Sequence, residues 1–394
     1  MNQRAFFRTG LSLVVVLMSL IAVQAEVGVT DMEIVIGTSL ALDGHASYLG
    51  TQTLHGAMTY INHINDAGGV NGRKIRVISY DDAYEPAKCT ENTNKLIDND
   101  NVFALFCYVG TPTSVEILPI IKAKKVPLVG LFTGAEVLRE PVIREVFNIR
   151  TSYYEETGGI VKHFWEDMGV RKIAVLYQND AYGEAGLKGV ELALSKFNSK
   201  PVAIATYERG SNAISEAMTT LRASDPEAVI IIGVYGPTST FIRSAKWSGF
   251  NPYFHTVSFV GADQLAELLG VGRDSNGTIV TQCVPPPTSD VPGAVEYRNL
   301  LKKYYPDDTP NFVSFEGFIN AKVLVSMLEK TGPALTRDAF IAAGESINVL
   351  DVGLGSAKIT YGPDDHRGLD QVYYTVIIDG KYEIISDFKT IKKY

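Results

Sequence analysis

The chain has 394 residues, of which 46% are apolar and 20% charged, and its 44 acidic and 36 basic residues give a formal charge of −8. The apolar share excludes an intrinsically disordered chain. The acidic balance argues against nucleic-acid binding, which needs basic residues to replace phosphate counterions. Three cysteines are too few for a disulfide-rich scaffold, and a chain of this length typically folds as about two domains.

Residues 1–25 have the three parts of a secretory signal peptide. Arg4 and Arg8 form a positive start, residues 10–23 are an uncharged apolar run, and Val23 and Ala25 are small residues that fit a cleavage site. A membrane anchor is the alternative, but the apolar run is shorter than the roughly 20 residues that a bilayer requires. We therefore expect cleavage after Ala25, a periplasmic location and no later membrane-spanning segment.

The first half of the remaining chain alternates apolar runs with helical patterns. The apolar runs predict strands at residues 33–40, 74–80, 102–109 and 126–132. Helices are predicted between them, at residues 51–67, 86–97 and 111–124. Strands and helices that alternate with short connections indicate a parallel sheet covered on both faces.

The pattern breaks at residues 146–154 and then begins again. Strands are predicted at residues 173–177, 202–206 and 228–234. Helices are predicted at residues 155–168, 183–197, 213–223 and 238–248. The fold class is therefore α/β, with two Rossmann-like halves that each have a parallel central sheet.

A third region follows these two halves. It begins with a predicted strand at 278–284 and three prolines, Pro285 to Pro287, which form a stiff connector because proline continues neither a ladder nor a helix. Helices are predicted at 294–304 and 315–329. The tail ends in a predicted hairpin, with strands at 371–378 and 381–385 around an Asp-Gly turn.

Motifs for catalysis and metal binding are largely missing from the sequence. There is no nucleophile elbow, no phosphate-binding loop and no complete dinucleotide fingerprint. His163 and Glu166 are three residues apart on a helix, but no third ligand lies nearby, which favours a solvated helix edge over a metal site. We expect a protein that is not an enzyme and that has no cofactor or metal. A secreted hydrolase remains an alternative that would need a nucleophile and a base across a cleft.

The cysteines leave two alternatives open. Cys89 lies early in the second predicted helix, and Cys107 lies at the end of the strand that should neighbour this helix. In an oxidising compartment they could form a disulfide, or they could be two buried free thiols. Cys283 is expected to be unpaired.

Two neighbouring strand ends carry residues suited to a carboxylate. In open parallel sheets, ligands bind at the carboxyl ends of the strands. Two such segments combine glycine for close backbone approach, helix N-terminal N–H groups and a threonine hydroxyl. They are Tyr108-Val109-Gly110-Thr111 and Phe132-Thr133-Gly134. Plain helix capping by the threonines is the alternative.

Tyrosines occupy the corresponding loops of both halves. Tyr48 lies in the first loop of the first half, and Tyr182 and Tyr235 follow strands of the second half. A tyrosine offers apolar area and one polar group, which suits a surface that closes on a small ligand. Some of these side chains could instead simply cover a hinge.

Four segments carry a resemblance to a known family. The chain resembles the extracytoplasmic solute-binding proteins of the branched-chain amino acid (leucine/isoleucine/valine) type, which supply ABC importers and have the type I periplasmic binding protein fold. The resemblance covers essentially the whole chain after residue 25. The segments that carry it are residues 34–40, residues 64–73 with their Asn-x-x-Gly-Gly-x-x-Gly pattern, Tyr80-Asp81-Asp82 and Asp180-Ala181-Tyr182-Gly183.

The resemblance implies two lobes joined by a three-crossing hinge near Arg150, Val284 and Tyr361. Lobe I would comprise residues 26–149 and 285–360, and lobe II residues 150–284 and 361–394. Pocket-lining positions of the family match Tyr48, Tyr182 and Tyr235. Its carboxylate site matches the two strand-end segments at residues 108–111 and 132–134.

Two family positions differ in this chain. The residue that matches the acid that binds the ligand ammonium is Ser258, and Tyr108 replaces a family serine at the carboxylate site. A buried ammonium without an acidic partner is costly. With Tyr108, Phe132 and Tyr153 near the cleft, we expect an aromatic or other apolar carboxylate or amide as the ligand.

The resemblance also implies the partners. We expect a monomer that binds a small molecule, that delivers it to an ABC permease in the inner membrane and that binds no nucleic acid. The alternative function is a ligand-sensing periplasmic receptor subunit of the same fold.

Overall fold

The computed structural model describes residues 26–394, so the predicted signal peptide lies outside the described residues. A first sheet has five parallel strands in the order β2-β1-β3-β4-β5. The strands are β1 (Glu33–Leu40), β2 (Lys74–Asp81), β3 (Ala104–Phe106), β4 (Leu128–Val129) and β5 (Val146–Phe147). The third and fourth strands are shorter than the apolar runs that predict them.

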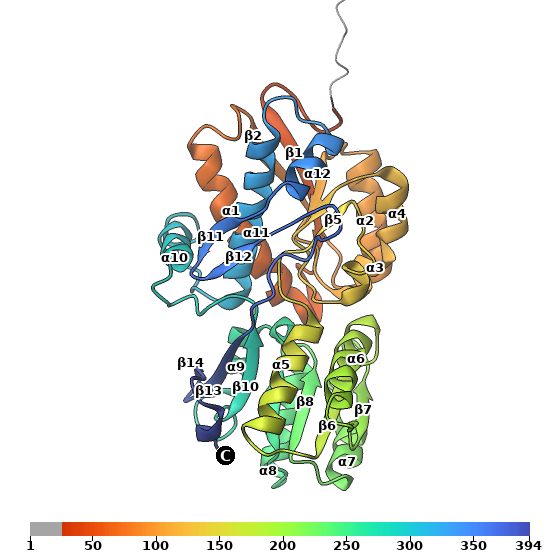
Figure 1. Ribbon diagram of the computed structural model, residues 1–394, viewed down its shortest axis with the longest axis vertical. Helices are drawn as coiled ribbons and strands as arrows, with labels where there is room; N and C mark the ends of the chain where they lie inside the picture. The colour runs from red at the N-terminus through yellow and green to blue at the C-terminus, as the bar shows by residue number, and fades with distance from the viewer. Residues whose placement is uncertain (1–25) are drawn as a thin grey trace, which may run out of the picture.

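Helices cover both faces of this sheet (Figure 1). One group packs together and contains α1 (Ser47–Asp66), α10 (Pro292–Tyr304), α11 (Phe312–Thr331) and α12 (Arg337–Glu345). The opposite group contains α2 (Pro86–Asp98), α3 (Thr111–Glu116) and α4 (Leu118–Lys124). The sequence predicts one helix over 111–124, but it divides at Ile117 because Pro119 has no N–H to continue the ladder.

A second sheet has seven strands in the order β14-β13-β10-β9-β8-β6-β7. Five are parallel: β6 (Ile173–Gln178), β7 (Ile204–Tyr207), β8 (Ala228–Ile232), β9 (Tyr253–Thr256) and β10 (Thr278–Gln282). The predicted hairpin adds β13 (Tyr373–Ile378) and β14 (Lys381–Ile384) antiparallel at one edge. The helices around this second sheet are α5 (Tyr153–Glu166), α6 (Ala181–Ser195), α7 (Ser215–Ala223), α8 (Tyr235–Trp247) and α9 (Ala262–Leu269).

The two sheets form two lobes with the same parallel strand order. If the parallel strands of each sheet are numbered along the chain, both sheets have the order 2-1-3-4-5. Figure 1 shows the first sheet and its helices above the second sheet and its helices, and we call these units lobe I and lobe II. This arrangement confirms the predicted α/β class with two parallel-sheet lobes.

The chain passes between the lobes three times, between β5 and α5, between β10 and α10, and after the small hairpin of β11 (Leu350–Leu354) and β12 (Ala357–Ile359). The first and third passages lie side by side. The Leu369 N–H donates to the Ile149 carbonyl at 2.8 Å, and the Tyr361 hydroxyl donates to the Asn148 carbonyl at 2.6 Å. Neighbouring segments that are hydrogen-bonded to each other can bend together as one hinge.

Some elements were not predicted from the sequence. Strand β9, helix α9 and helix α12 fall in stretches for which no element is predicted. These segments have four, eight and nine residues, so few positions carry a periodic signal. Helix α5 begins two residues before its predicted start, because Ser152 caps it and forms a capping box with Glu155.

The structure selects the second alternative for the cysteines, since Cys89, Cys107 and Cys283 are all buried free thiols. Tyr108 points toward α2, where its hydroxyl and that of Thr93 are hydrogen-bonded at 3.0 Å. Cys107, which has φ of +55°, points to the other face, where Asn320 of α11 donates to its sulfur at 3.6 Å. Cys89 and Cys107 therefore do not form the disulfide that the sequence left open, because α2 and the Cys107 side chain lie on opposite faces of the sheet.

Candidate functional site

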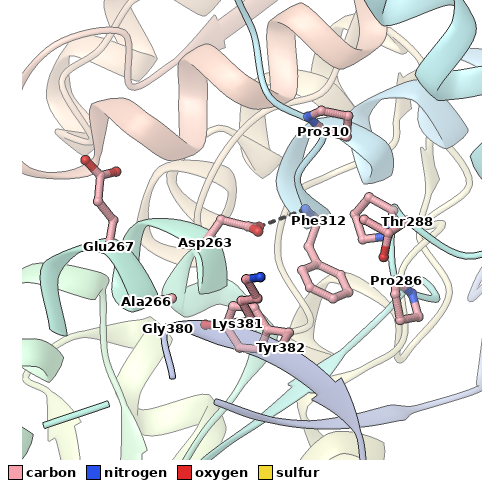
Figure 2. Close-up of a pocket in the computed structure, with 11 residues that line it drawn as sticks. Asp263, Ala266, Glu267, Pro286, Thr288, Pro310, Phe312, Gly380, Lys381 and Tyr382 are labelled. Carbon is pink, nitrogen blue, oxygen red and sulfur yellow. Dashed lines mark hydrogen bonds between the residues drawn. The ribbon is translucent and has the colours of Figure 1, made fainter. Parts of the chain in front are cut away.

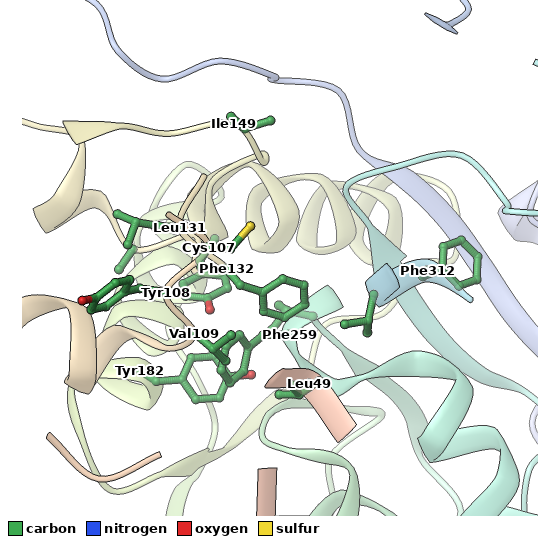
Figure 3. Close-up of a cluster of buried hydrophobic side chains, with 14 of the residues drawn as sticks. Leu49, Cys107, Tyr108, Val109, Leu131, Phe132, Ile149, Tyr182, Phe259 and Phe312 are labelled. Carbon is green, nitrogen blue, oxygen red and sulfur yellow. The ribbon is translucent and has the colours of Figure 1, made fainter. Parts of the chain in front are cut away.

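Aromatic side chains from both lobes meet where the carboxyl ends of the two sheets face each other. Phe259 of lobe II lies 5.6 Å from the ring of Phe132 and 5.9 Å from that of Tyr84, both in lobe I. Within lobe II, its ring centroid lies 4.5 Å from that of Tyr182, which lies 5.4 Å from that of Tyr153. All five side chains are buried, and Figure 3 shows Phe132, Tyr182 and Phe259 converging. We call these five residues the aromatic cluster.

Phe259 reaches the cluster because its loop is held against lobe I. The loop is a short 3₁₀ turn, Ser258–Val260, which ends at Gly261 with φ of +75°. A Cβ at Gly261 would lie 2.7 Å from the side chain of Leu49 in α1. Only glycine allows both this backbone conformation and this close approach between the lobes.

Tyr84 is held by an unusual turn after β2. Ala83 and Tyr84 have φ of +50° and +63°, a conformation that costs energy in residues other than glycine. The buried carboxyl of Asp82 stabilises the turn, since it accepts bonds from the Ser39 hydroxyl at 2.7 Å and from the Tyr84 N–H at 2.9 Å. Burial raises the pKa of Asp82 to about 6, and the bond from Ser39 opposes the shift.

Two predicted tyrosines lie at the rim of this region. Tyr48 from α1 and Tyr235 from α8 meet edge to face across the lobes, with ring centroids 6.1 Å apart. Both side chains are only partly buried, unlike those of the aromatic cluster. These two side chains therefore make a direct contact between the lobes at the edge of the aromatic cluster.

The two segments predicted to bind a carboxylate lie side by side. The hydroxyls of Thr111 and Thr133 are hydrogen-bonded to each other at 2.6 Å. The Phe132 N–H bonds the Tyr108 carbonyl at 2.8 Å, and the Gly110 N–H bonds the Phe132 carbonyl at 3.1 Å. These two backbone N–H groups therefore bond the two segments to each other, and Val109 and Phe132 form a parallel β-bridge between them.

Tyr108 and Gly134 have roles that differ from the predicted ones. The Tyr108 ring is turned toward α2, where its hydroxyl meets that of Thr93, so the prediction that this side chain lies near the cleft is wrong. The left-handed backbone of Cys107, with φ of +55°, directly precedes Tyr108 and interrupts the extended strand there. Gly134 supports the cluster, since its carbonyl accepts the Tyr153 N–H at 2.7 Å and a Cβ would lie 2.8 Å from the Tyr153 ring.

A group of buried charged and polar side chains lies beside the aromatic cluster, and we call it the charge cluster. It consists of Arg150, Glu156, Ser258, Cys283 and Glu316. The Arg150 guanidinium donates to the Ser258 hydroxyl, lies 3.3 Å from the Cys283 sulfur, and stacks 4.4 Å above the Phe132 ring. Its Nε lies 3.3 Å from the Glu316 carboxyl, so Arg150 joins groups from both lobes.

Ser258 has a carboxylate directly behind it. Both its N–H and its hydroxyl donate to Glu156 at 2.8 Å, and the Thr281 hydroxyl donates to the same carboxylate at 2.5 Å. The sequence analysis considered only residue 258 itself and therefore missed this acid. Glu156 lies 102 residues earlier in the chain, on α5. Its oxygens are already occupied by protein donors.

Burial also changes the protonation of the charge cluster. Burial raises the pKa of Glu316 to about 7; Arg150 opposes this shift, whereas Glu156 adds to it. Burial raises the pKa of Cys283 to about 12, so it stays a thiol. Near neutral pH, the protonation of Glu316 therefore sets the charge of the cluster.

A separate cavity of about 410 Å³ lies at the border of the lobes (Figure 2). Its wall includes Asp263 of α9, the connector residues Pro286 and Pro287, Phe312 of α11 and Tyr382 of β14. None of the predicted site residues lines it. The Asp263 carboxylate accepts the Phe312 N–H at 2.9 Å, and this hydrogen bond joins lobe II to lobe I.

The structure brings together most of the predicted side chains and adds others. Phe132, Tyr153, Tyr182 and Ser258 lie in the two clusters, and Tyr48 and Tyr235 lie at the rim. Sequence reasoning missed Tyr84, Phe259, Glu156 and Glu316, and it treated Arg150 only as a hinge position. Two of these could have been found, since Tyr84 follows the Asp81-Asp82 motif and Phe259 follows Ser258. Among residues 26–394, no group of three or more His, Cys, Asp or Glu side chains could hold a metal ion.

Two lobes of the same strand order, with three connections and facing strand ends, define a periplasmic binding protein of type I. Residues 33–381 match the model of the Periplasmic binding protein family, and the chain belongs to this family. Its relatives are solute-binding proteins and not enzymes, as the sequence predicts. None of the helices described for residues 26–394 combines the length and apolar character needed to cross a membrane.

Three comparisons illustrate the relationship. The crystal structure of a possible leucine/isoleucine/valine-binding protein from Rhodopirellula baltica SH 1 is 33% identical, with a TM-score of 0.87 over 92% of this chain and 98% of that one. An amino acid binding protein from Pseudomonas aeruginosa is 26% identical over 66% of this chain and 71% of its own length. Leu/Ile/Val-binding protein homolog 7 of Brucella abortus is 22% identical over 88% of each chain.

Proposed function

We propose that this protein is the periplasmic solute-binding component of an ABC importer. Its two lobes close on a small carboxylate or amino-acid-like ligand with an apolar or aromatic side chain, and the closed form delivers the ligand to a membrane permease. The relatives described as amino acid or Leu/Ile/Val-binding proteins support a ligand of this size.

One observation carries this proposal. Phe259 of lobe II contacts Phe132 and Tyr84 of lobe I, so the aromatic cluster exists only when the lobes are together. A ligand that replaces or extends these contacts stabilises the closed form over the open form. Twisting of the three crossings near Arg150, Val284 and Tyr361 would separate residues 26–149 and 285–360 from residues 150–284 and 361–394.

A thermal-shift screen followed by calorimetry tests the binding role. The protein is first unfolded and refolded to remove any ligand bound during expression. We expect at least one small amino acid, carboxylate or amide to raise the melting temperature and to bind one per chain. Small-angle scattering should show a smaller radius of gyration with this ligand. A screen without any hit would contradict the proposed function.

The second candidate is a ligand-sensing receptor subunit of the same fold. Uptake of the labelled ligand into vesicles that contain a candidate ABC permease distinguishes the two functions. Uptake that depends on the protein supports transport, whereas binding without uptake favours sensing. Mass spectrometry of the exported protein tests cleavage after Ala25, and light scattering tests the expected monomer.

A further inference from the structure

The guanidinium of Arg150 is buried without partners for all of its donors. The side chain has no exposed surface, and only Nη2 donates hydrogen bonds, to Ser258 and Cys283. Nε and Nη1 have no hydrogen-bond partner, and the nearby Glu316 Oε1 lies at 3.3 Å without hydrogen-bond geometry. Unpaired donors on a buried charge are costly, so such a group calls for an acceptor from outside the chain.

A second unused polar group lies three residues after Arg150 in the chain. The Tyr153 hydroxyl is buried and has no partner that meets hydrogen-bond geometry, although Tyr153 belongs to the aromatic cluster. Phe132 joins the two clusters, since its ring packs against Phe259 on one side and against the Arg150 guanidinium on another. The unused N–H groups therefore lie directly beside the aromatic cluster.

The carboxylates of the charge cluster are already engaged within the protein, Glu156 by hydrogen bonds and Glu316 by its ion pair with Arg150. Glu156 already accepts from the Ser258 N–H, the Ser258 hydroxyl and Thr281. Glu316 faces Arg150, which is itself a fixed positive charge in the cleft. An ammonium group placed directly against the Arg150 guanidinium would meet like charge, whereas a carboxylate at that place would meet opposite charge and unfilled donors.

We propose that Arg150 binds the carboxylate of the ligand and that the ligand is an aromatic or branched-chain carboxylic acid without an α-ammonium group. This inference rests on the proposed function and specifies its ligand class. The carboxylate takes the free N–H groups of Arg150, with the Tyr153 hydroxyl as a further donor. The apolar part of the ligand packs against the aromatic cluster. A planar guanidinium suits this task because it offers paired donors to both oxygens of a carboxylate.

Matched ligands test this inference on the refolded protein. The probes form two series of equal side chain: 3-phenylpropanoate, phenylalanine and phenethylamine, and 4-methylpentanoate, leucine and 3-methylbutylamine. We expect one of the two acids to bind at least 10-fold more tightly than its amino acid, and neither amine to bind. An amino acid that binds as tightly as its acid, or no binding by either acid, overturns the inference. Tight binding of an amino acid would overturn it and leave the proposed function standing.

Two variants test the role of Arg150 itself with the tighter acid. Arg150→Lys should weaken binding at least 10-fold, because a lysine offers one point charge in place of paired donors. Arg337→Lys is the control, since Arg337 is a partly buried arginine that donates to the carbonyls of Val102 and Phe103 within lobe I. The affinity of this control variant for the acid should stay within twofold of that of the parent protein.

The Arg150 variant removes part of a buried ion pair and could fail to fold. Glu316→Gln keeps the inference testable, because it removes only the charge that competes for Arg150. We expect this variant to bind the acid at least threefold more tightly at pH 8. Unchanged or weaker binding by a folded Glu316→Gln variant contradicts the role of Arg150.

Discussion

The carboxylate of Asp263 in lobe II accepts a hydrogen bond of 2.9 Å from the backbone N–H of Phe312, at the start of helix α11 in lobe I. A carboxylate at a helix N-terminus is also stabilised by the helix dipole. The Phe312 ring packs edge to face on Tyr382 of lobe II, 5.6 Å between centroids. Asp263 and Phe312 therefore form a contact that must break when the lobes separate.

Asp263→Ala should weaken ligand binding by about 3- to 10-fold, because the net contribution of one hydrogen bond is about 0.5–1.5 kcal/mol. The variant loses this hydrogen bond only in the closed form, so calorimetry should show weaker ligand binding. Small-angle scattering should show a larger average radius of gyration than for the parent protein. Asp225→Ala is the control, since Asp225 is an exposed residue that pairs with Lys172 within lobe II. Equal affinities of the two variants would show that Asp263 does not stabilise closure.

Phe259→Leu should lower ligand affinity and change ligand preference. The leucine removes ring contacts with Tyr182 and Phe132 and leaves space in the aromatic cluster. We expect aromatic acids to lose more affinity than branched-chain acids of similar size. Phe103→Leu is the matched control, because Phe103 is equally buried but packs on Phe340 within lobe I. It should lower the melting temperature and leave the ligand preference unchanged.

Gly110→Ala should disturb the aromatic cluster through Tyr84. Gly110 has φ of +99°, and a Cβ there would overlap the Tyr84 ring. We expect a loss of stability together with at least 10-fold weaker binding. Gly249→Ala carries a similar backbone strain at φ of +76° but meets no atom within 4 Å, so it should cost only about 1 kcal/mol of stability. Normal binding by Gly110→Ala would show that Tyr84 is not needed for the site.

Binding of a carboxylate should weaken as the pH rises from 6 to 8.5. Burial raises the pKa of Glu316 from 4.5 to about 7, Arg150 and Arg139 oppose the shift, and Glu156 adds to it. Below this pH Glu316 is mostly neutral and Arg150 is available to the ligand. Above it, the Glu316 carboxylate competes for the guanidinium. Calorimetry across this range should show the trend, and Glu316→Gln should remove it.

The same shift gives the sign of the effect on stability. Between pH 4.5 and about 7, the folded protein holds the Glu316 proton that the unfolded chain releases. The contribution of this group to the free energy of unfolding therefore falls as the pH rises through this window. Denaturation of the ligand-free protein at several pH values measures it. A parent protein and a Glu316→Gln variant with parallel pH profiles would contradict the assignment.

All three cysteines should be inaccessible free thiols. Cys89, Cys107 and Cys283 are buried, and burial raises the pKa of Cys107 and Cys283 above the ordinary thiol value. Alkylation followed by mass spectrometry should therefore label none of them in the native protein and all three after unfolding without reductant. Two unlabelled cysteines in the unfolded, unreduced protein would indicate a disulfide.

The sequence by itself determined the alternation of strands and helices and the presence of two similar α/β halves. These features depend on local periodicity and on turn residues, such as the Asp379-Gly380 turn between β13 and β14, which a short window of sequence contains. Most of the aromatic side chains of the site could also be predicted, because they follow strands whose carboxyl ends meet at one edge.

Only the tertiary structure decided the chemistry at the polar end of the site. Arg150 and Ser258 are separated by 108 residues, and Ser258 and Glu156 by 102, yet they are hydrogen-bonded. No local pattern shows that Ser258 is backed by a carboxylate and faced by a guanidinium. The physical reason is that charge balance in a buried cleft depends on side chains that several distant segments bring within a few ångströms, and only folding sets those distances.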